Sequence, residues 1–216
     1  MQSLICMLLF SMTLSCAAQE WQLENEKDQI KLFSQNTSSG IKKVKAITTI
    51  HSRLGALILL LDDTEKSSDW IDSIDKVELI ERPQLNQAIV HSYFSAPWPI
   101  EDRDMITLSN TFQNKQNLQI RIDIQDYGEH YPKHKDYIRM HSVQGTWLVS
   151  PLPDGQIEIQ YQGTADPAGH IPLWLVNKIM LSSTRNTFKQ LRRIIVKPEY
   201  QTEPPSYIHE IASQIP

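Results

Sequence analysis

The side chains that could do chemistry are few in this chain, and they are scattered. His51, His91 and His141 stand alone, and an isolated histidine usually packs or bonds to the backbone rather than forming a site. His130 and His134 have the spacing of two metal ligands on a helix, but Pro132 between them disfavours a helix there. The chain has no Gly-x-Ser-x-Gly motif, no phosphate-binding glycine loop and no paired-cysteine zinc motif. The sequence therefore predicts neither an enzyme nor a metal or cofactor site.

A long helix near the C-terminus is the next unusual feature. It is expected from about Ile171 to Val196, with Pro172 tolerated in its first turn and Lys197-Pro198 ending it. Its first half is apolar in nearly every direction around the axis. A helix of this kind is either covered by a loop or faces something apolar, such as a membrane surface or the chain of a lipid.

The charges on this helix favour a membrane surface. Between His170 and Pro198 the chain has six basic residues and no acidic one. Cations near a C-terminal end also complement the helix dipole, which explains Arg192, Arg193 and Lys197 but hardly Lys178. Each cation near anionic headgroups contributes about 1 kcal/mol. We therefore predict a gate or membrane-contact surface formed by Leu173, Trp174, Val176 and Lys178.

The elements around this helix predict an α+β domain. Strands are expected between residues 20 and 50 and over five later segments, which are Gln87–Phe94, Met105–Phe112, Leu118–Asp126, Tyr137–Ser150 and Gln156–Gly163. The strict alternation of Ile120, Ile122 and Ile124 with polar residues indicates one face on a core and one face in water. Two short helices are expected at His51–Leu61 and Ser67–Ile74. An antiparallel sheet with one long helix against it can enclose a cavity.

The N-terminus predicts export. The first nineteen residues contain no Lys, Arg, Asp or Glu, and Leu4 to Leu14 is an apolar stretch followed by small residues. This pattern predicts a signal peptide of residues 1–18 and a periplasmic or secreted protein, with a buried N-terminal helix as the alternative. Both cysteines, Cys6 and Cys16, lie in this segment, and Cys16 could instead carry a lipid anchor after a lipoprotein cut.

The rest of the chain is expected to form one domain of residues 19–197, followed by a polar, proline-containing tail of residues 198–216. The tail should wrap the surface or be disordered. The net charge of −4 gives no overall attraction to nucleic acid, so we expect no nucleic-acid partner. We expect a monomer.

Four stretches resemble the START lipid-transfer domain family, in the family's order. They are Asp69-Trp70, Trp98-Pro99-Ile100-Glu101-Asp102-Arg103-Asp104-Met105-Ile106, the strand pair containing Tyr137–Met140 and Gly145–Val149, and Gly169-His170-Ile171-Pro172 with the helix that follows. The resemblance implies a helix-grip fold, in which a curved antiparallel sheet wraps a long C-terminal helix around a hydrophobic tunnel. It also implies that one sterol, phospholipid or similar lipid is bound without covalent chemistry. Together with the leader, it suggests a bacterial exported member of the family.

Arg103 is the residue of this signature that could contact the ligand. In some family members the matching arginine projects inside, where it pairs with an acid or meets a polar headgroup. Glu101, Asp102 and Asp104 are the candidate acids, and a buried arginine without a partner would be costly. The predicted ligand-binding residues are Arg103, Met105, Met140, Trp147, Trp174 and Met180.

Two other classes of function stay open at this point. Folds of this kind host many functions, so a cyclase or hydrolase that uses pocket histidines and aspartates is one alternative. A periplasmic protein-interaction module that uses the apolar helix face is the other.

Overall fold

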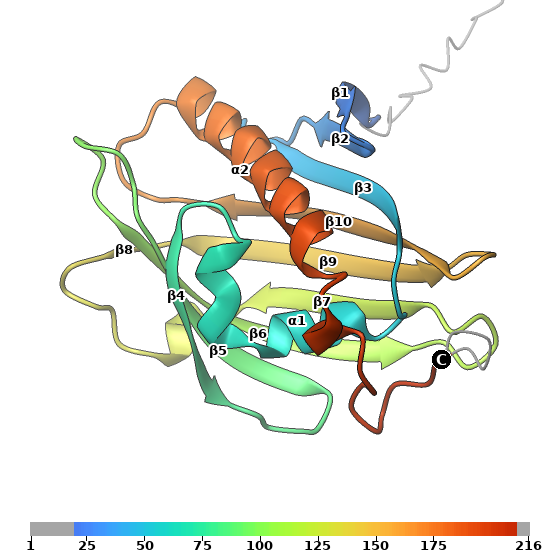
Figure 1. Ribbon diagram of the computed structural model, residues 1–216. Coiled ribbons are helices and arrows are strands. Elements are labelled where there is room, and N and C mark those ends of the chain that lie inside the picture. Colours follow the sequence, from blue (N-terminus) through green and yellow to red (C-terminus); the bar gives the residue numbers. More distant parts are fainter. Residues whose placement is uncertain (1–19, 211–216) are drawn as a thin grey trace, which may run out of the picture.

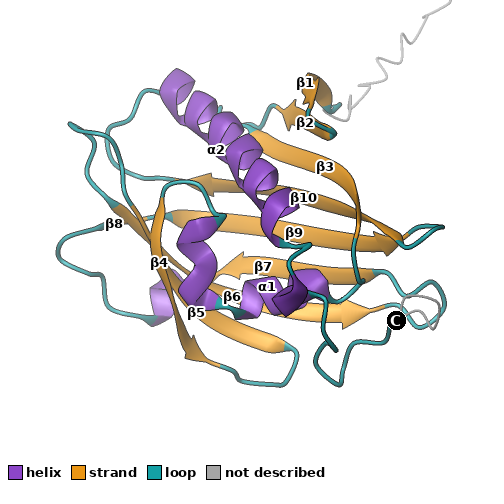
Figure 2. Cartoon of the chain, viewed as in Figure 1, coloured by secondary structure: helices purple, strands orange, loops and turns teal. Residues whose placement is uncertain are grey.

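The structure is a computed structural model, and it describes residues 20–210. The predicted signal peptide, Cys16 included, lies outside these residues and stays a prediction. A ten-stranded sheet dominates the fold, and the two α-helices lie on one side of it (Figures 1 and 2). The predicted architecture is confirmed, because a curved antiparallel sheet grips one long C-terminal helix in an α+β fold.

The sheet is built mostly from neighbouring antiparallel strands. In chain order they are β1 (Gln22–Lys27), β2 (Ile30–Gln35), β3 (Lys43–His51), β4 (Ile74–Glu81), β5 (Gln87–Phe94), β6 (Arg103–Gln113), β7 (Ile120–Asp126), β8 (Ile138–Arg139), β9 (His141–Pro151) and β10 (Gln156–Asp166). Their spatial order is β1-β2-β3-β10-β9-β7-β6-β5-β4, and the short β8 pairs in parallel with the start of β6. The predicted strand Tyr137–Ser150 is therefore two strands, which part at Met140.

The helical elements are few. They are α1 (Ala56–Asp62), α2 (Leu173–Ile194) and the 3-10 helices η1 (Thr64–Asp69), η2 (Gly128–His130) and η3 (Pro198–Tyr200). No helix within residues 20–210 is long and apolar enough to cross a membrane.

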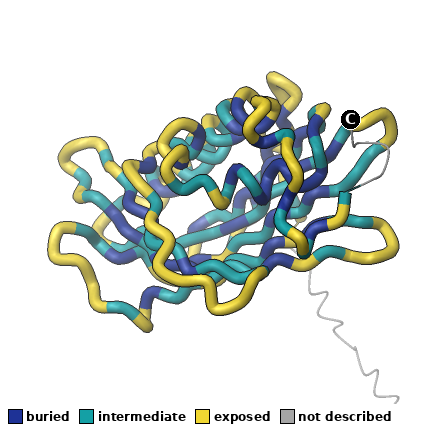
Figure 3. The backbone as a smooth tube through the Cα atoms, turned by 60° about the horizontal axis from the view of Figure 1, so that its bottom comes forward, coloured by how far each residue is buried: buried dark blue, intermediate teal, exposed yellow. Residues whose placement is uncertain are grey.

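The alternating residues of β7 and β10 point to the inner face of the sheet, toward α2. The fully packed members of the two series are Ile120, Ile122, Ile157 and Ile159. The next members, Ile124 and Tyr161, line a cavity instead. Exposed residues gather in the loops at the two ends of the sheet, as Figure 3 shows. The period of two therefore predicts which face is inside, but not where the core stops and the cavity begins.

α2 is held on the sheet by packing and by two of its arginines. Phe188 is 1% exposed and stacks on Trp147, with 5.7 Å between the ring centroids. Arg185 pairs with Asp28 at 3.2 Å, and Arg192 donates a hydrogen bond to a carbonyl of β3 at 2.7 Å. Two of the six basic residues predicted to face a membrane therefore bind the sheet.

The segment that joins α1 to β5 differs from its prediction. The helix expected at Ser67–Ile74 is the 3-10 helix η1, which ends at Asp69, and β4 follows it. β4 lies at the edge of the sheet with nearly all its side chains exposed, so it lacks the apolar alternation that marks a strand. The first helix also begins later than predicted, because β3 continues to pair with β10 as far as His51.

The described part of the predicted tail packs on the domain. Tyr200 and Ile208 belong to the hydrophobic core, being 3% and 5% exposed. The Glu210 carboxylate accepts hydrogen bonds from the backbone N–H groups of Leu54 and Gly55, at 3.1 and 2.9 Å. These N–H groups precede α1, which has no side-chain cap of its own. The polar composition of the tail did not predict this capping role, because the residues that Glu210 caps are distant in the sequence.

Candidate functional site

A cavity of about 550 Å³ lies between α2 and the concave face of the sheet. Inner residues of β5, β6, β7, β9 and β10 form one wall, and one side of α2 forms the other. The lining is mainly apolar, with a few polar side chains. This size and composition are those of a small-molecule site that buries an apolar ligand and orients it by a few polar contacts.

Most of the predicted ligand-binding residues line this cavity. Those that do so are Arg103, Met105, Met140, Trp147 and Met180. Trp174 does not, because its side chain is 68% exposed on the outer side of α2. Residues two apart on a helix point about 200° apart, so Trp174 and the inward-facing Val176 lie on opposite sides of α2. The placement of Trp174 in the tunnel wall is therefore corrected.

The residues predicted to form a membrane-contact surface fall on two faces. Lys178 is exposed on the same outer side as Trp174, which is four residues earlier. Leu173 is 49% exposed, but it lies beside Gly40 and points nearer to the direction of Val176 than to that of Trp174. Val176 is 5% exposed and lines the cavity, so it belongs to the inner face. The apolar start of α2 thus contacts the cavity on one side and solvent on the other, and no described loop covers Trp174.

Two connecting segments border one end of the cavity. Pro97 and Ile100 belong to the loop between β5 and β6, and Ile171 lies just before α2. Trp98, at the tip of the first loop, is 93% exposed. Large exposed apolar side chains therefore flank this end of the cavity on both segments. The position of Trp98 there was not predicted.

Asn177 fixes the start of α2 and was missed by the sequence analysis. Its side chain accepts a hydrogen bond from the Lys42 backbone N–H at 2.8 Å and donates one to the Gly40 carbonyl at 3.0 Å. One side chain therefore ties the first turns of α2 to the turn before β3. No local sequence signal predicts this contact, because the partners are far apart in the chain.

Arg103 and Asp104 are consecutive on β6, so their side chains point to opposite faces of the sheet. Asp104 is fully buried beneath β8 and accepts hydrogen bonds from Nε and Nη2 of Arg139 at 2.9 and 2.8 Å. The other face of this contact is His91, whose Nε2 lies 2.6 Å from Oδ2 of Asp104. Burial would raise the pKa of Asp104, but the hydrogen bonds from Arg139 and His91 outweigh it and lower that pKa.

Arg103 projects into the cavity wall and is 6% exposed. Its guanidinium donates to the carbonyl of Glu101 and, at 3.4 Å, to that of Pro167. Asp104 is occupied on the other face, and the Asp102 carboxylate accepts a hydrogen bond from the Ala96 N–H at 2.9 Å. Burial lowers the pKa of Arg103, against the nearby charges of Glu101 and Asp102. Within residues 20–210, no carboxylate forms an ion pair with it.

Three hydroxyl groups complete the polar lining. Ser92, Thr107 and Tyr161 line the cavity, and their hydroxyls form no hydrogen bond within the described chain. Tyr161 ends the alternating series of β10 that the sequence shows clearly, so its inward direction was predictable from the pattern. His130 and His134 do not share a helix, as Pro132 indicated. His130 is the last residue of the 3-10 helix η2, and His134 lies beyond it, where it packs on Tyr93.

The fold and the cavity together define a helix-grip protein with an internal apolar pocket. The sequence matches the START domain family over residues 4–199. The chain belongs to this family. Lipid binding is the general function that family membership supports.

Relatives of known sequence agree with this assignment. An uncharacterized protein of Pseudomonas aeruginosa is 27% identical over 185 residues, which are 85% of this chain and 91% of that protein. START domain-containing protein 10 of the mouse is 27% identical over 143 residues, which are 66% of this chain. The chain spans 49% of the length of that mouse relative.

Solved structures show the same fold. A STAR-related lipid transfer protein from Xanthomonas axonopodis superposes with a TM-score of 0.76 at 22% identity, over 82% of this chain and 99% of that one. Human STARD10 gives a TM-score of 0.73 at 22% identity, over 85% of this chain and 76% of that one.

Proposed function

We propose that the protein binds one amphipathic lipid in its cavity, without catalysing a reaction on it, and transfers the lipid at membrane surfaces. The observation that carries this proposal is a buried arginine in the wall of an otherwise apolar cavity of about 550 Å³. The apolar lining suits a lipid chain, and Arg103 suits its headgroup.

The headgroup is proposed to be anionic. Within residues 20–210, Arg103 donates only to backbone carbonyls. Asp102 and Asp104 bond elsewhere, and the exposed Glu101 forms no ion pair with Arg103. A buried cation gains most from a carboxylate or a phosphate, because charge-assisted hydrogen bonds are roughly twice as strong as neutral ones. The proposal therefore favours an acidic lipid, such as a fatty acid, over a plain sterol or hydrocarbon.

Replacing Arg103 by leucine is expected to weaken stearate binding roughly 10- to 100-fold, the range for a hydrogen bond to a charged group. Binding of methyl stearate, which has no charge, should change little. Delipidated protein is titrated with both ligands, and native mass spectrometry counts the bound molecules; wild-type protein should carry one. Arg121→Leu, in the exposed pair with Asp123 at 2.8 Å, is the matched control. Equal losses for both ligands, together with a lower melting temperature, would make Arg103 structural only.

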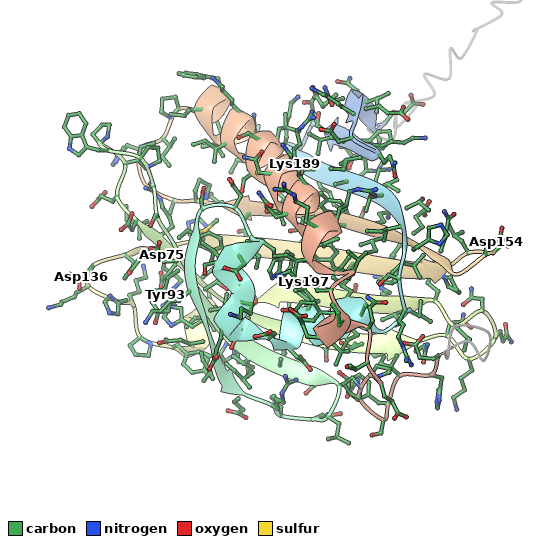
Figure 4. All side chains as sticks on the ribbon, viewed as in Figure 1. Asp75, Tyr93, Asp136, Asp154, Lys189 and Lys197 are labelled. Atoms are coloured by element: carbon green, nitrogen blue, oxygen red, sulfur yellow. The ribbon has the colours of Figure 1, made fainter. Side chains whose placement is uncertain are left out.

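The outer side of α2 is proposed to dock on the membrane. Lys178 and Lys189 are both exposed, and their separation of eleven positions makes about three turns, so they share one face of α2. Figure 4 labels Lys189 on α2 and Lys197 just beyond its end. Arg193 and Lys197 are exposed too. Leu173, Trp174 and Trp98, exposed beside the bordered end of the cavity, supply apolar contacts to the same membrane. Movement of α2 and the loop before β6 would release the lipid there.

The double replacement Lys178→Ser and Lys189→Ser is expected to slow transfer to vesicles containing phosphatidylglycerol roughly 30-fold, since each of the two cations contributes about 1 kcal/mol near an anionic surface. Transfer to neutral phosphatidylcholine vesicles should hardly change. A fluorescent fatty acid followed by energy transfer measures both rates. The pair Lys66→Ser and Lys115→Ser, also exposed and equal in charge change, is the control. If both double variants are equally slow, net charge and not this face of α2 is responsible.

A further inference from the structure

A second polar group faces the cavity on β10, with β9 and β7 lying between it and the strand of Arg103. Tyr161 lines the cavity and packs against Trp147, with 4.7 Å between the ring centroids. Its hydroxyl forms no hydrogen bond to any residue between 20 and 210. Burial alone raises the pKa of Tyr161 to about 12, so the group is a neutral phenol at physiological pH.

A tyrosine hydroxyl in this position is harder to satisfy than the other cavity hydroxyls. Ser92 and Thr107 have short side chains that can turn back to nearby backbone carbonyls. The Tyr161 hydroxyl stands at the far end of a rigid ring that lies over Gly163, near the Gln144 carbonyl, and it forms no hydrogen bond with that carbonyl. It opens onto the cavity rather than being sealed inside the protein, so its partner comes from whatever fills the cavity. Phenylalanine would fill the same space and would leave no hydroxyl that requires a partner.

Two glycines make room for this ring. Gly163 and Gly145 face each other in the register of β10 and β9, and both line the cavity. A Cβ added to Gly163 would lie 2.7 Å from Cζ of Tyr161, and one added to Gly145 would lie 3.5 Å from the hydroxyl oxygen. Covering bare glycines is a known use of an aromatic ring in a sheet, but phenylalanine would serve it equally. The packing explains the ring and leaves the hydroxyl unexplained.

We propose that the Tyr161 hydroxyl is a second binding point for the ligand, and that the lipid therefore carries a hydroxyl or keto oxygen on its apolar part. A neutral phenol both donates and accepts hydrogen bonds, so it can pair with either group. This inference rests on the proposed function, since the headgroup would stay at Arg103. It adds the substrate class: an acidic lipid oxygenated within its chain or ring system.

The test compares stearate with a set of hydroxystearates and ketostearates whose oxygen lies at different carbons. Each competes with a fluorescent fatty acid for delipidated protein. At least one oxygenated isomer should bind wild-type protein about five- to tenfold tighter than stearate, as one neutral hydrogen bond allows. Tyr161→Phe should lose the preference, so that its affinities for the oxygenated isomer and for stearate become equal. Tyr207→Phe, at a partly buried tyrosine that packs on the core elsewhere, should keep it.

The outcomes separate this inference from the function on which it rests. If stearate binds but no isomer is preferred, or if Tyr161→Phe keeps the preference, the Tyr161 subsite is wrong and the lipid carrier stands. If no fatty acid displaces the probe from any variant, both are wrong. The melting temperature of ligand-free Tyr161→Phe should equal or exceed that of the wild type. A clear decrease would mean that the hydroxyl is bonded within the protein, which also overturns the inference.

Discussion

Replacing Asp104 by alanine is expected to destabilise the protein by about 3–5 kcal/mol, the usual cost of breaking a buried ion pair by removing one partner. Arg139 would lose both of its carboxylate contacts and stay 7% exposed, as an uncompensated buried charge. β8, which carries Arg139, would keep its backbone pairing with β6 but lose the ion pair that reinforces it. Urea denaturation of the purified variant measures the change in the free energy of unfolding.

A matched pair on the neighbouring strand provides the control for this experiment. Asp123 pairs with Arg121 at 2.8 Å, but its side chain is 38% exposed, so Asp123→Ala should cost less than about 1 kcal/mol. Equal losses for Asp104→Ala and Asp123→Ala would contradict the role given to burial.

Acid should act through the same carboxylate. The folded state lowers the pKa of Asp104 below the unfolded value of about 3.9, so its contribution to stability is complete above that pH. The contribution is lost as the pH falls through the lower folded value. The difference in stability between wild type and Asp104→Ala should therefore be constant near neutral pH and shrink below pH of about 4.

Replacing Phe188 by alanine is expected to cost about 3–5 kcal/mol, the range for truncating a buried phenylalanine. Phe188 is 1% exposed, stacks on Trp147 and lines the cavity, so it anchors α2 and shapes the binding space at once. Thermal and urea unfolding measure the loss. If α2 is also the gate, the variant should release a bound fluorescent fatty acid faster than the wild type.

Phe112 on β6 is the control for this truncation. Its side chain is 53% exposed, so Phe112→Ala should change the free energy of unfolding by less than about 1 kcal/mol. A loss below about 1 kcal/mol for Phe188→Ala would contradict its anchoring role, because it would mean that the cavity absorbs the truncation without loss of packing.

Much of the architecture could be predicted from local patterns. The alternation along β7 and β10 identified two strands and their inner faces, since a strand has a side-chain period of two. The turn between β9 and β10 has the sequence Pro153-Asp154-Gly155, in which proline presets φ and glycine supplies a positive φ. Asp154 lies at the opposite end of the sheet from Asp136 (Figure 4). The edge strand β4 was missed, because exposed edges carry no such pattern.

The sequence predicted most residues of the candidate site, but it did not predict which side of α2 faces the cavity. Arg103, Met105 and Trp147 were assigned to the cavity from the family resemblance, and they line it. Trp174 was assigned with them, because an all-round apolar helix does not reveal which side faces inward. That choice depends on where β2 and β3 contact α2, and those contacts are distant in sequence.

The sequence by itself determined the strands of the sheet interior, the long acid-free helix and the family to which the chain belongs, because each of these depends on short-range patterns. Only the tertiary structure decided which charged residues form ion pairs. It placed Asp104 with Arg139 and left Arg103 in the cavity wall, although the two residues are adjacent in the chain. The pleat sends consecutive side chains to opposite faces, and each face then meets partners from distant segments.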